Sequence, residues 1–341
     1  MTVPPLAERP YQLAPASAAI VPARWPGTCH DDAVILVAGE ALVDLVVAGH
    51  EVSAAAGGAP YNVARACARL GEEIALLASI SGDGFGRLLE AGLADAGVAR
   101  DLLQRTDQPT TLAVAQLDPA GGATYTFYVA GTSVPLLQPG AVPAGTDVLV
   151  AGGLGLVLEP MATGVERLLL GAPAEVLVVL DVNCRPVAIG DRDRYVERVR
   201  RIVARADVVK ASDEDLRYLA PEAEAEEAAR WLLGHGAGVV LVTAGADATL
   251  VVSAAGTVRV PVGAVDVVDT IGAGDSFTAG FVTWWCRRGW GRPRLGDVTA
   301  VVDAVRAAHA VAAVVVTRRG ADPPTPADLP APWSPDPSTG R

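Results

Sequence analysis

The chain has 341 residues, of which 51% are hydrophobic, and its formal net charge is −12. This length and apolar content allow one large α/β domain or two smaller ones, each with a sizeable core. The negative charge argues against a non-specific nucleic-acid binder, whose contact surface would be basic. No uninterrupted apolar run is long enough to cross a bilayer. The nearest, residues 298–316, contains Asp303, Arg306 and His309 and predicts a buried helix.

Both ends of the chain are expected to be poorly ordered tails, because residues 1–30 are rich in Pro and Ala and residues 322–341 are rich in Pro. No basic stretch followed by an apolar run marks a secretory signal. The cysteines lack the spacing of a zinc site and are expected to be free thiols in a reducing cytoplasm. They are Cys29, Cys67, Cys184 and Cys286. We therefore expect a cytoplasmic protein with no nucleic-acid or membrane partner.

Short apolar runs rich in β-branched residues predict strands that are covered on both faces, since the runs are continuous rather than alternating. They lie at residues 33–38, 147–152, 176–181, 207–210 and 238–243. Stretches with helical spacing alternate with them, at residues 60–70, 84–96, 160–170, 192–205 and 223–234. This alternation predicts an α/β fold with a doubly wound, mostly parallel sheet.

One region breaks the alternation and predicts a small antiparallel sheet. Residues 111–117 and 123–129 flank the turn-forming spacer DPAGG (118–122), which is typical of a hairpin. Residues 46–58 are able to add a further strand pair. We interpret this patch as a lid over the site, with an ordinary edge hairpin as the alternative.

The stretch VDTIGAGDSF (268–277) places small residues directly before Asp275 and an apolar helix. The start of a helix has N–H groups without partners and a dipole that favours negative charge, and small residues let an anion approach the main chain. This predicts a phosphate site at Gly272, Ala273 and Gly274. Asp275 fits a general base that takes a proton from a hydroxyl attacking a phosphoryl group. A helix-capping or first-turn acid is the alternative, and it is the commoner use of an acid at this position.

Other polar residues follow predicted strands, where ligands of open α/β sheets gather. Asp44 in GEALVDL follows the first strand and is able to hold two sugar hydroxyls, with an exposed strand-end acid as the alternative. Asn62 in GGAPYN has the donor and acceptor groups that suit a polyol, with a tight turn near a helix start as the alternative. In KASDED (210–215), Ser212 and Asp215 have the spacing of a capping box, and binding of a cation through water is the other use.

Taken in order, these segments resemble the ribokinase-like (PfkB) carbohydrate kinase family from about Val34 to Ala321. GGAPYNVARACARLG (57–71) is similar to the first family signature and VDTIGAGDSFTAGF (268–281) to the second. DVNCRP (181–186) and ATYTFYVAGTS (123–133) resemble the fructokinase and 2-keto-3-deoxygluconate kinase branch. The aromatic residue that commonly follows DVNCRP in that branch is missing, since VAIG comes next.

The resemblance implies a three-layer fold with a β lid, in one kinase domain at residues 31–321 with lid segments at about 46–58 and 110–131. It implies transfer of the γ-phosphoryl group of ATP to a sugar hydroxymethyl, with Asp275 as catalytic base and residues 272–274 as anion hole. Relatives that dimerise through the lid suggest a homodimer. The alternatives are a nucleoside kinase of the same fold, with Tyr125, Phe127 and Tyr128 lining a base pocket, and an inactive sugar-binding regulator.

Site residues follow from the same resemblance. The predicted sugar contacts are Asp44, Gly57, Gly58, Asn62 and Arg185. The predicted nucleotide contacts are Lys210, Ser212, Thr243, Gly245 and His309, for which a core position is the alternative. Asp215 is expected near Mg²⁺ through water, and Asp269 near a monovalent cation such as K⁺. Family members often carry Asn and Glu in place of Ser212 and Asp215, which have a shorter reach.

Overall fold

The computed structural model describes residues 34–117, 123–331 and 333. The predicted N-terminal tail, Cys29 and the DPAGG spacer lie outside the described residues. Within them, Cys67, Cys184 and Cys286 are free thiols, as the cysteine spacing predicts.

The centre of the fold is an eight-stranded sheet in the order β14-β13-β12-β11-β10-β9-β1-β4. Its strands are β1 (Val34–Ala38), β4 (Glu73–Leu77), β9 (Val148–Gly152), β10 (Leu177–Asp181), β11 (Val208–Ser212), β12 (Val239–Ala244), β13 (Asp247–Ser253) and β14 (Gly256–Val260). The pairs from β4 to β12 are parallel, and β13 and β14 add antiparallel hairpins at one edge. The prediction of a doubly wound, mostly parallel sheet is confirmed.

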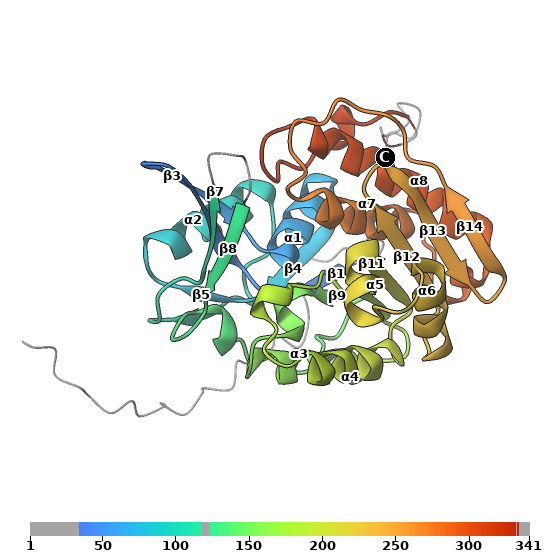
Figure 1. The fold of residues 1–341 in the computed structure, drawn as a ribbon, viewed down its shortest axis with the longest axis horizontal. Helices are drawn as coiled ribbons and strands as arrows, with labels where there is room; N and C mark the ends of the chain where they lie inside the picture. The colour runs from blue at the N-terminus through green and yellow to red at the C-terminus, as the bar shows by residue number, and fades with distance from the viewer. Residues whose placement is uncertain (1–33, 118–122, 332, 334–341) are drawn as a thin grey trace, which may run out of the picture.

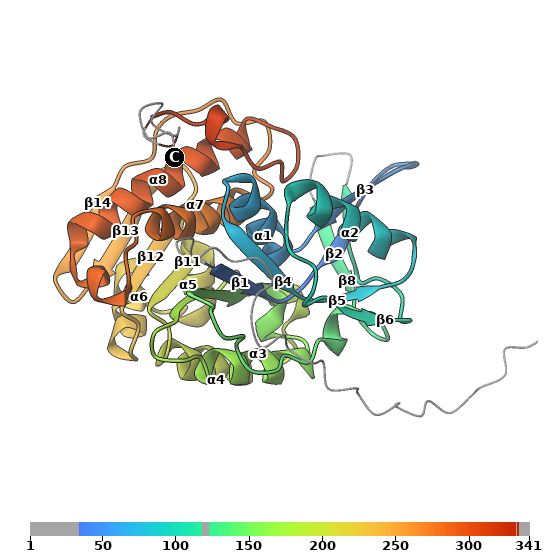
Figure 2. The same cartoon turned by 180° about the vertical axis from the view of Figure 1, so that it is seen from behind.

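Helices cover both faces of this sheet, which gives three layers (Figures 1 and 2). One layer contains α1 (Ala59–Arg69), α2 (Gly84–Ala96), α7 (Ala273–Arg287) and α8 (Val298–Val316), and the other contains α3 (Met161–Leu170), α4 (Arg192–Val203), α5 (Asp213–Leu219) and α6 (Ala225–Gly234). Strand side chains alternate between the layers: Ile35 and Val37 pack in the first core, Leu36 and Ala38 in the second. Successive strand residues point to opposite faces, so a strand covered on both sides needs a continuous apolar run.

The long apolar helix α8 is buried in part, as its three polar residues lead us to expect. By length and composition alone it is able to cross a membrane, yet half of its most apolar window is buried inside the protein. It packs beside α7 in the first core. The helix therefore reads as a core element of this fold.

A separate four-stranded sheet, in the order β3-β2-β7-β8, lies at the end of the molecule away from β13 and β14 (Figure 1). It consists of β2 (Leu42–Ala48), β3 (Glu51–Gly57), β7 (Leu112–Leu117) and β8 (Ala123–Tyr128). β7 and β8 form the predicted antiparallel hairpin, and β2 joins β7 in parallel. A lid function and a dimer through this sheet stay predictions.

Short elements complete the chain. β5 (Ser79–Ser81) pairs with β6 (Gln104–Thr106). Five short 3₁₀ helices in the described residues are η1 (Val134–Leu136), η2 (Gly153–Leu156), η3 (Pro186–Ala188), η4 (Arg292–Gly296) and η5 (Pro326–Asp328).

The expectation of a poorly ordered C-terminal tail is wrong for the described part of residues 322–341. Leu329 and Trp333 are only 5% and 2% exposed. The Trp333 ring lies 5.2 Å from the ring of Trp284 in α7, and the guanidinium of Arg287 lies over it. The Pro-rich composition predicted a tail because it does not show that Leu329 and Trp333 are buried. The free energy gained by burying these side chains exceeds the entropic cost of ordering the segment.

We expect Trp333→Ala to lower the free energy of unfolding by about 3–5 kcal/mol, because it removes a fully buried aromatic side chain. Denaturant unfolding followed by circular dichroism measures the change. Leu170→Ala, which truncates a partly exposed apolar side chain on α3, serves as the control and should shift stability far less. Equal midpoints for Trp333→Ala and the wild type would show that the C-terminal segment contributes nothing.

Candidate active site

Polar residues gather where the parallel strands end. The chain runs from β1 to β4 on one side, and the later strands β9 to β12 lie on the other side of β1. Such a reversal leaves a crevice at the carboxyl ends of the strands, where open α/β sheets bind ligands. Arg185 follows β10, Asp215 follows β11 and Gly245 follows β12, and the candidate residues 272–275 lie at the start of α7.

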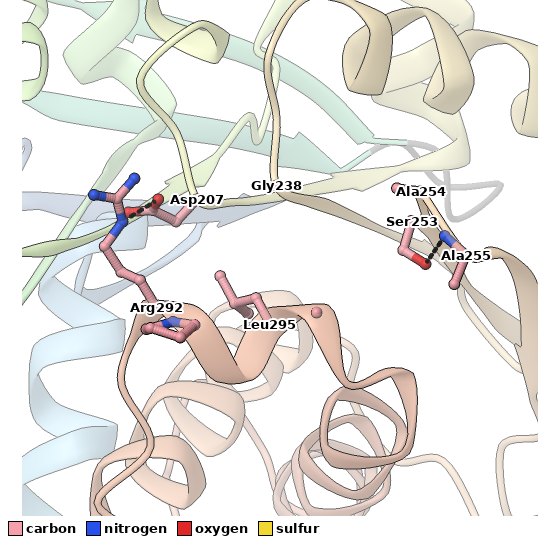
Figure 3. Close-up of a pocket in the computed structure, with 9 residues that line it drawn as sticks. Asp207, Gly238, Ser253, Ala254, Ala255, Arg292 and Leu295 are labelled. Atoms are coloured by element: carbon pink, nitrogen blue, oxygen red, sulfur yellow. Dashed lines mark hydrogen bonds and ion pairs between the residues drawn. The ribbon is translucent and has the colours of Figure 1, made fainter.

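A cavity of about 470 Å³ lies at the other end of the parallel strands. It is beside Asp207 and Gly238, at the amino ends of β11 and β12 (Figure 3). The Asp207 carboxylate accepts hydrogen bonds from Arg292 Nε at 2.7 Å and from Arg205 Nη1 at 3.1 Å. Its charge is thus satisfied within the protein, and we interpret the cluster as structural.

The start of α7 has the form of an anion site. Gly272 is left-handed, with φ of 78°, and a Cβ there would lie 2.7 Å from Ala321 Cβ. Among the described residues, the N–H groups of Gly274 and Asp275 have no backbone acceptor. Both donors therefore lie at the positive end of the helix dipole, as an oxyanion or phosphate requires. That Gly272, Ala273 and Gly274 form the anion hole stays a prediction.

Asp275 lies in the first turn of α7 and is 8% exposed. Asn62 Nδ2 donates to its Oδ2 at 2.8 Å, and Asn183 Nδ2 donates to its Oδ1 at 3.4 Å. The helix start has no side-chain cap, but Asp275 stands in the first turn of α7, so the alternative of a first-turn acid stays open beside the catalytic prediction. The carboxylate faces side chains from α1 and from the loop after β10.

Burial raises the pKa of Asp275 to about 6, and the nearby Asp181 adds to the rise. The Asn62 hydrogen bond and the charges of Lys210 and Arg185 lower this pKa in part. A pKa of about 6 leaves the carboxyl group mostly ionised at pH 7. It also lies near enough to pH 7 for the carboxylate to accept a proton, as a general base must.

A buried ion pair lies behind the start of α7. Lys210 Nζ donates to Asp181 Oδ1 at 3.0 Å, and Thr278 Oγ1 donates to Asp181 Oδ2 at 2.7 Å. Burial lowers the pKa of Lys210, but the charges of Asp181 and Asp215 outweigh it and hold the pKa above its usual value. A Cβ on Gly274 would lie 3.0 Å from Lys210 Nζ, so this cation lies directly behind the predicted anion hole. A direct contact of Lys210 with nucleotide stays a prediction.

Four of the predicted sugar-side residues lie on β2, at the end of β3 and at the start of α1, and the fifth, Arg185, follows β10. Asp44 belongs to β2, and a Cβ on Gly57 would lie only 2.0 Å from Asp44 Oδ2, so glycine there makes room for the carboxylate. Gly58, with φ of 104°, precedes α1 and leads into Asn62. Burial raises the pKa of Asp44 to about 6, against the charge of Arg185. Among the described residues no hydrogen-bond donor to this carboxylate is found, and its contact with sugar stays a prediction.

Glu40 is a buried acid near the predicted site that the sequence reasoning did not single out. Glu40 lies two residues after the end of β1 and is 3% exposed. Its side chain accepts a hydrogen bond from Gly155 N at 3.2 Å. Burial raises its pKa to about 7, while backbone hydrogen bonds and the charge of Arg185 lower it. An acid at the end of an apolar strand was the available signal. Glu40, Asp44 and Asp275 thus share Arg185 as a neighbouring cation.

The capping box at Ser212 and Asp215 is confirmed. Ser212 Oγ accepts from Asp215 N at 3.0 Å, and Asp215 Oδ2 accepts from Ser212 N at 2.7 Å. The other oxygen of Asp215 accepts from Cys184 N at 2.6 Å. Within the described residues no group of three His, Cys, Asp or Glu side chains is arranged to hold a metal. A water-mediated influence of Asp215 on Mg²⁺ stays a prediction.

The predicted nucleotide residues follow on the neighbouring strands. Thr243 pairs with Ser212 across β11 and β12, and Gly245 makes the turn after β12 with φ of 55°. His309 is half-buried; its Nε2 is 2.8 Å from Thr249 Oγ1 and its ring is 5.6 Å from the Phe277 ring. Its Nδ1 has no hydrogen-bond partner among the described residues, so the alternative of a satisfied core histidine stays open, and burial lowers its pKa. Its contact with adenine stays a prediction.

Asp269 ties the loop before α7 to the end of α8. Its Oδ1 accepts from Ile271 N at 3.0 Å and its Oδ2 accepts from Gly320 N at 2.8 Å. Each oxygen keeps a lone pair, and oxygen atoms are the ligands that hard cations prefer. The residue therefore fits the predicted monovalent-cation site, which stays a prediction.

Comparison with known proteins places these features in one group of enzymes. The profile of the pfkB family carbohydrate kinases matches residues 27–328. A fructokinase of Rhizobium leguminosarum bv. trifolii is 36% identical over 257 residues, which is 73% of this chain and 78% of the relative. An aminoimidazole riboside kinase of Salmonella typhimurium is 30% identical over 296 residues, 84% of this chain and 90% of the relative.

Solved structures agree with the sequence matches. A fructokinase from Xylella fastidiosa with bound ATP has a TM-score of 0.78 at 30% identity and covers 84% of this chain and 93% of its own. A fructokinase double mutant from Vibrio cholerae O395, with fructose, ADP and potassium bound, has a TM-score of 0.75 at 26% identity and covers 85% of this chain and 94% of its own. These four matches cover between 73% and 85% of this chain.

Proposed function

The chain belongs to the pfkB family of carbohydrate kinases, and from this premise we propose that it transfers the γ-phosphoryl group of ATP to a hydroxymethyl group of a neutral, fructose-like sugar. One observation carries the proposal. The hydrogen bond between Asn62 and Asp275 joins the two signature segments, although the residues are 213 positions apart. It brings a sugar-side residue and the carboxylate at the start of α7 to one point.

In the proposed mechanism Asp275 accepts the proton of the attacking hydroxyl. The hydroxyl oxygen then forms a bond to the γ-phosphorus, and the bond from that phosphorus to the β–γ bridging oxygen breaks, which releases ADP. The free N–H groups at the start of α7, with Lys210 behind them, stabilise the charge on the phosphoryl oxygens. The sheet of β2, β3, β7 and β8 would cover the sugar and exclude water, so that ATP is not hydrolysed.

Cations complete the proposed site. Mg²⁺ bound with the nucleotide would neutralise charge on the phosphates. Asp215, whose two oxygens already accept backbone N–H groups, would influence it through water. A potassium-bound fructokinase relative and the free lone pairs of Asp269 support K⁺ beside the loop before α7.

Charge favours a neutral sugar over a sugar acid. Glu40, Asp44 and Asp275 share one neighbouring cation, Arg185, while Lys210 is paired with Asp181. A substrate carboxylate would add a further negative charge to this group at a cost in free energy. The similarity to fructokinases supports the same choice.

Coupled ADP release tests the proposal, with fructose, 2-keto-3-deoxygluconate, ribose and nucleosides, each with and without K⁺. We expect turnover of fructose with a kcat/KM about tenfold or more above that of the sugar acid. A substrate carboxylate buried beside like charges should weaken transition-state binding by at least this factor. Preference for a nucleoside would support the alternative raised by the riboside kinase relative. Tight sugar binding with no ADP release from any substrate would refute the kinase and favour a sugar-binding regulator.

A further inference from the structure

The loop after β10 contains a residue with an uncommon backbone conformation. Asn183 has φ of 38°, and no other non-glycine residue in the described chain has a positive φ. Asparagine enters this region more readily than most residues, yet a single occurrence beside a site points to a constraint that comes from the surroundings.

Both flanks of Asn183 are held by buried polar contacts. On one side Asp181 is bonded to Lys210 and Thr278, and Val182 N donates to Lys210 O at 2.9 Å. On the other side Cys184 N donates to Asp215 Oδ1 at 2.6 Å. Asp215 is itself fixed by the capping box at the start of α5. The backbone of residues 182–184 is therefore pinned at both ends, and the side chain of Asn183 points back to the start of α7.

We propose that Asn183 is a positioning residue for Asp275, which it holds together with Asn62 through one amide donor on each carboxylate oxygen. This inference rests on the proposed function, in which Asp275 is the base. Two donors on opposite oxygens fix the plane of the carboxylate and leave a lone pair for the hydroxyl proton. The Asn62 bond lowers the pKa of Asp275 in part, and a donor on the other oxygen acts in the same direction because it bonds to the charged group.

Three charged groups act on Asp275, one on β11 and two around the end of β10. Asp181 at the end of β10 opposes its ionisation, whereas Lys210 on β11 and Arg185 after β10 favour it. Loss of the Asn183 donor removes one group that stabilises the ionised form of Asp275 against the charge of Asp181, so the pKa of Asp275 should rise. Activity needs the ionised base, so activity would then appear only at higher pH.

The test compares Asn183→Gly, Asn183→Ala and Asn183→Asp by the pH profile of kcat. Wild-type activity should fall as the pH drops through about 6, the pKa of Asp275. Glycine adopts a positive φ freely, so Asn183→Gly removes the amide but keeps the backbone. We expect its kcat to fall about tenfold and its acidic limb to move up by about half to one pH unit, with the KM for ATP little changed. Asn183→Asp, which keeps shape and adds charge, should move the limb further.

Two outcomes would overturn this role. An Asn183→Gly enzyme with wild-type kcat and limb, beside an impaired Asn183→Ala enzyme, would show that only the backbone conformation matters. Wild-type profiles in all three variants would show that the residue has no role in the reaction. An active Asp275→Asn enzyme would instead refute the proposed base, which separates failure of the proposed function from failure of this inference.

Discussion

Asp275→Asn lowers kcat by about 10³-fold in our account, because general-base catalysis supplies an acceleration of this order. The amide has the shape of the carboxylate but cannot take up the hydroxyl proton. The N–H groups at the start of α7 and the sugar-side residues are left in place, so ATP and sugar should still bind within a few-fold of the wild type. Steady-state ADP release gives kcat, and calorimetric titration gives the two binding constants.

A matched control separates this effect from the loss of any acid at a helix start. Asp213 lies in the first turn of α5, where it forms a surface ion pair with Arg217. Asp213→Asn should keep wild-type kcat. A fall in kcat of less than about tenfold in Asp275→Asn would be too small for a general base and would contradict the mechanism.

Lys210→Met is expected to lower the free energy of unfolding strongly, by an amount similar to that of Trp333→Ala. Lys210 and Asp181 are about 5% exposed each, and removal of the cation leaves the Asp181 carboxylate buried with only Thr278 as side-chain donor. Breaking a buried pair on one side costs about 3–5 kcal/mol, since the remaining charge is uncompensated. Urea unfolding measures the free-energy change, and the cation behind the anion hole is lost as well, so kcat should also fall.

Two further variants define what the buried pair contributes. Arg200→Met breaks an exposed pair with Glu197 and should cost less than about 1 kcal/mol. The double change Asp181→Leu with Lys210→Met should recover much of the lost stability, because an apolar pair removes the desolvation cost of the lone charge. A Lys210→Met protein as stable as Arg200→Met would show that Asp181 is not held as an ion pair.

The sequence predicted the architecture well because local patterns determine it. Continuous β-branched runs correctly located β1 and β9 to β12, and the spacer between two β-rich runs correctly located the hairpin of β7 and β8. Strands β13 and β14 were not singled out, since an antiparallel edge adds no strand–helix alternation. The C-terminal segment was misjudged, because its composition is that of a tail while Leu329 and Trp333 find partners only in the folded protein.

The candidate site could be predicted only where a motif is contiguous. The glycines before Asp275 and the capping box at Ser212 could be predicted because each depends on residues that are adjacent in the sequence. The roles of Glu40, of the pair of Asp181 and Lys210, and of Asn183 depend on strands that are distant in sequence and adjacent in the sheet. A buried acid and an exposed acid look the same in a sequence, so pKa shifts and partners of such groups emerge only with the fold.

The most direct test of the central claim is transfer of the γ-phosphoryl group of labelled ATP to fructose by the wild type and by Asp275→Asn at neutral pH. We expect labelled sugar phosphate and stoichiometric ADP from the wild type, and about 10³-fold slower product formation from the variant that still binds both substrates. Equal rates of product formation in the two proteins, or no labelled sugar from the wild type, would contradict the account.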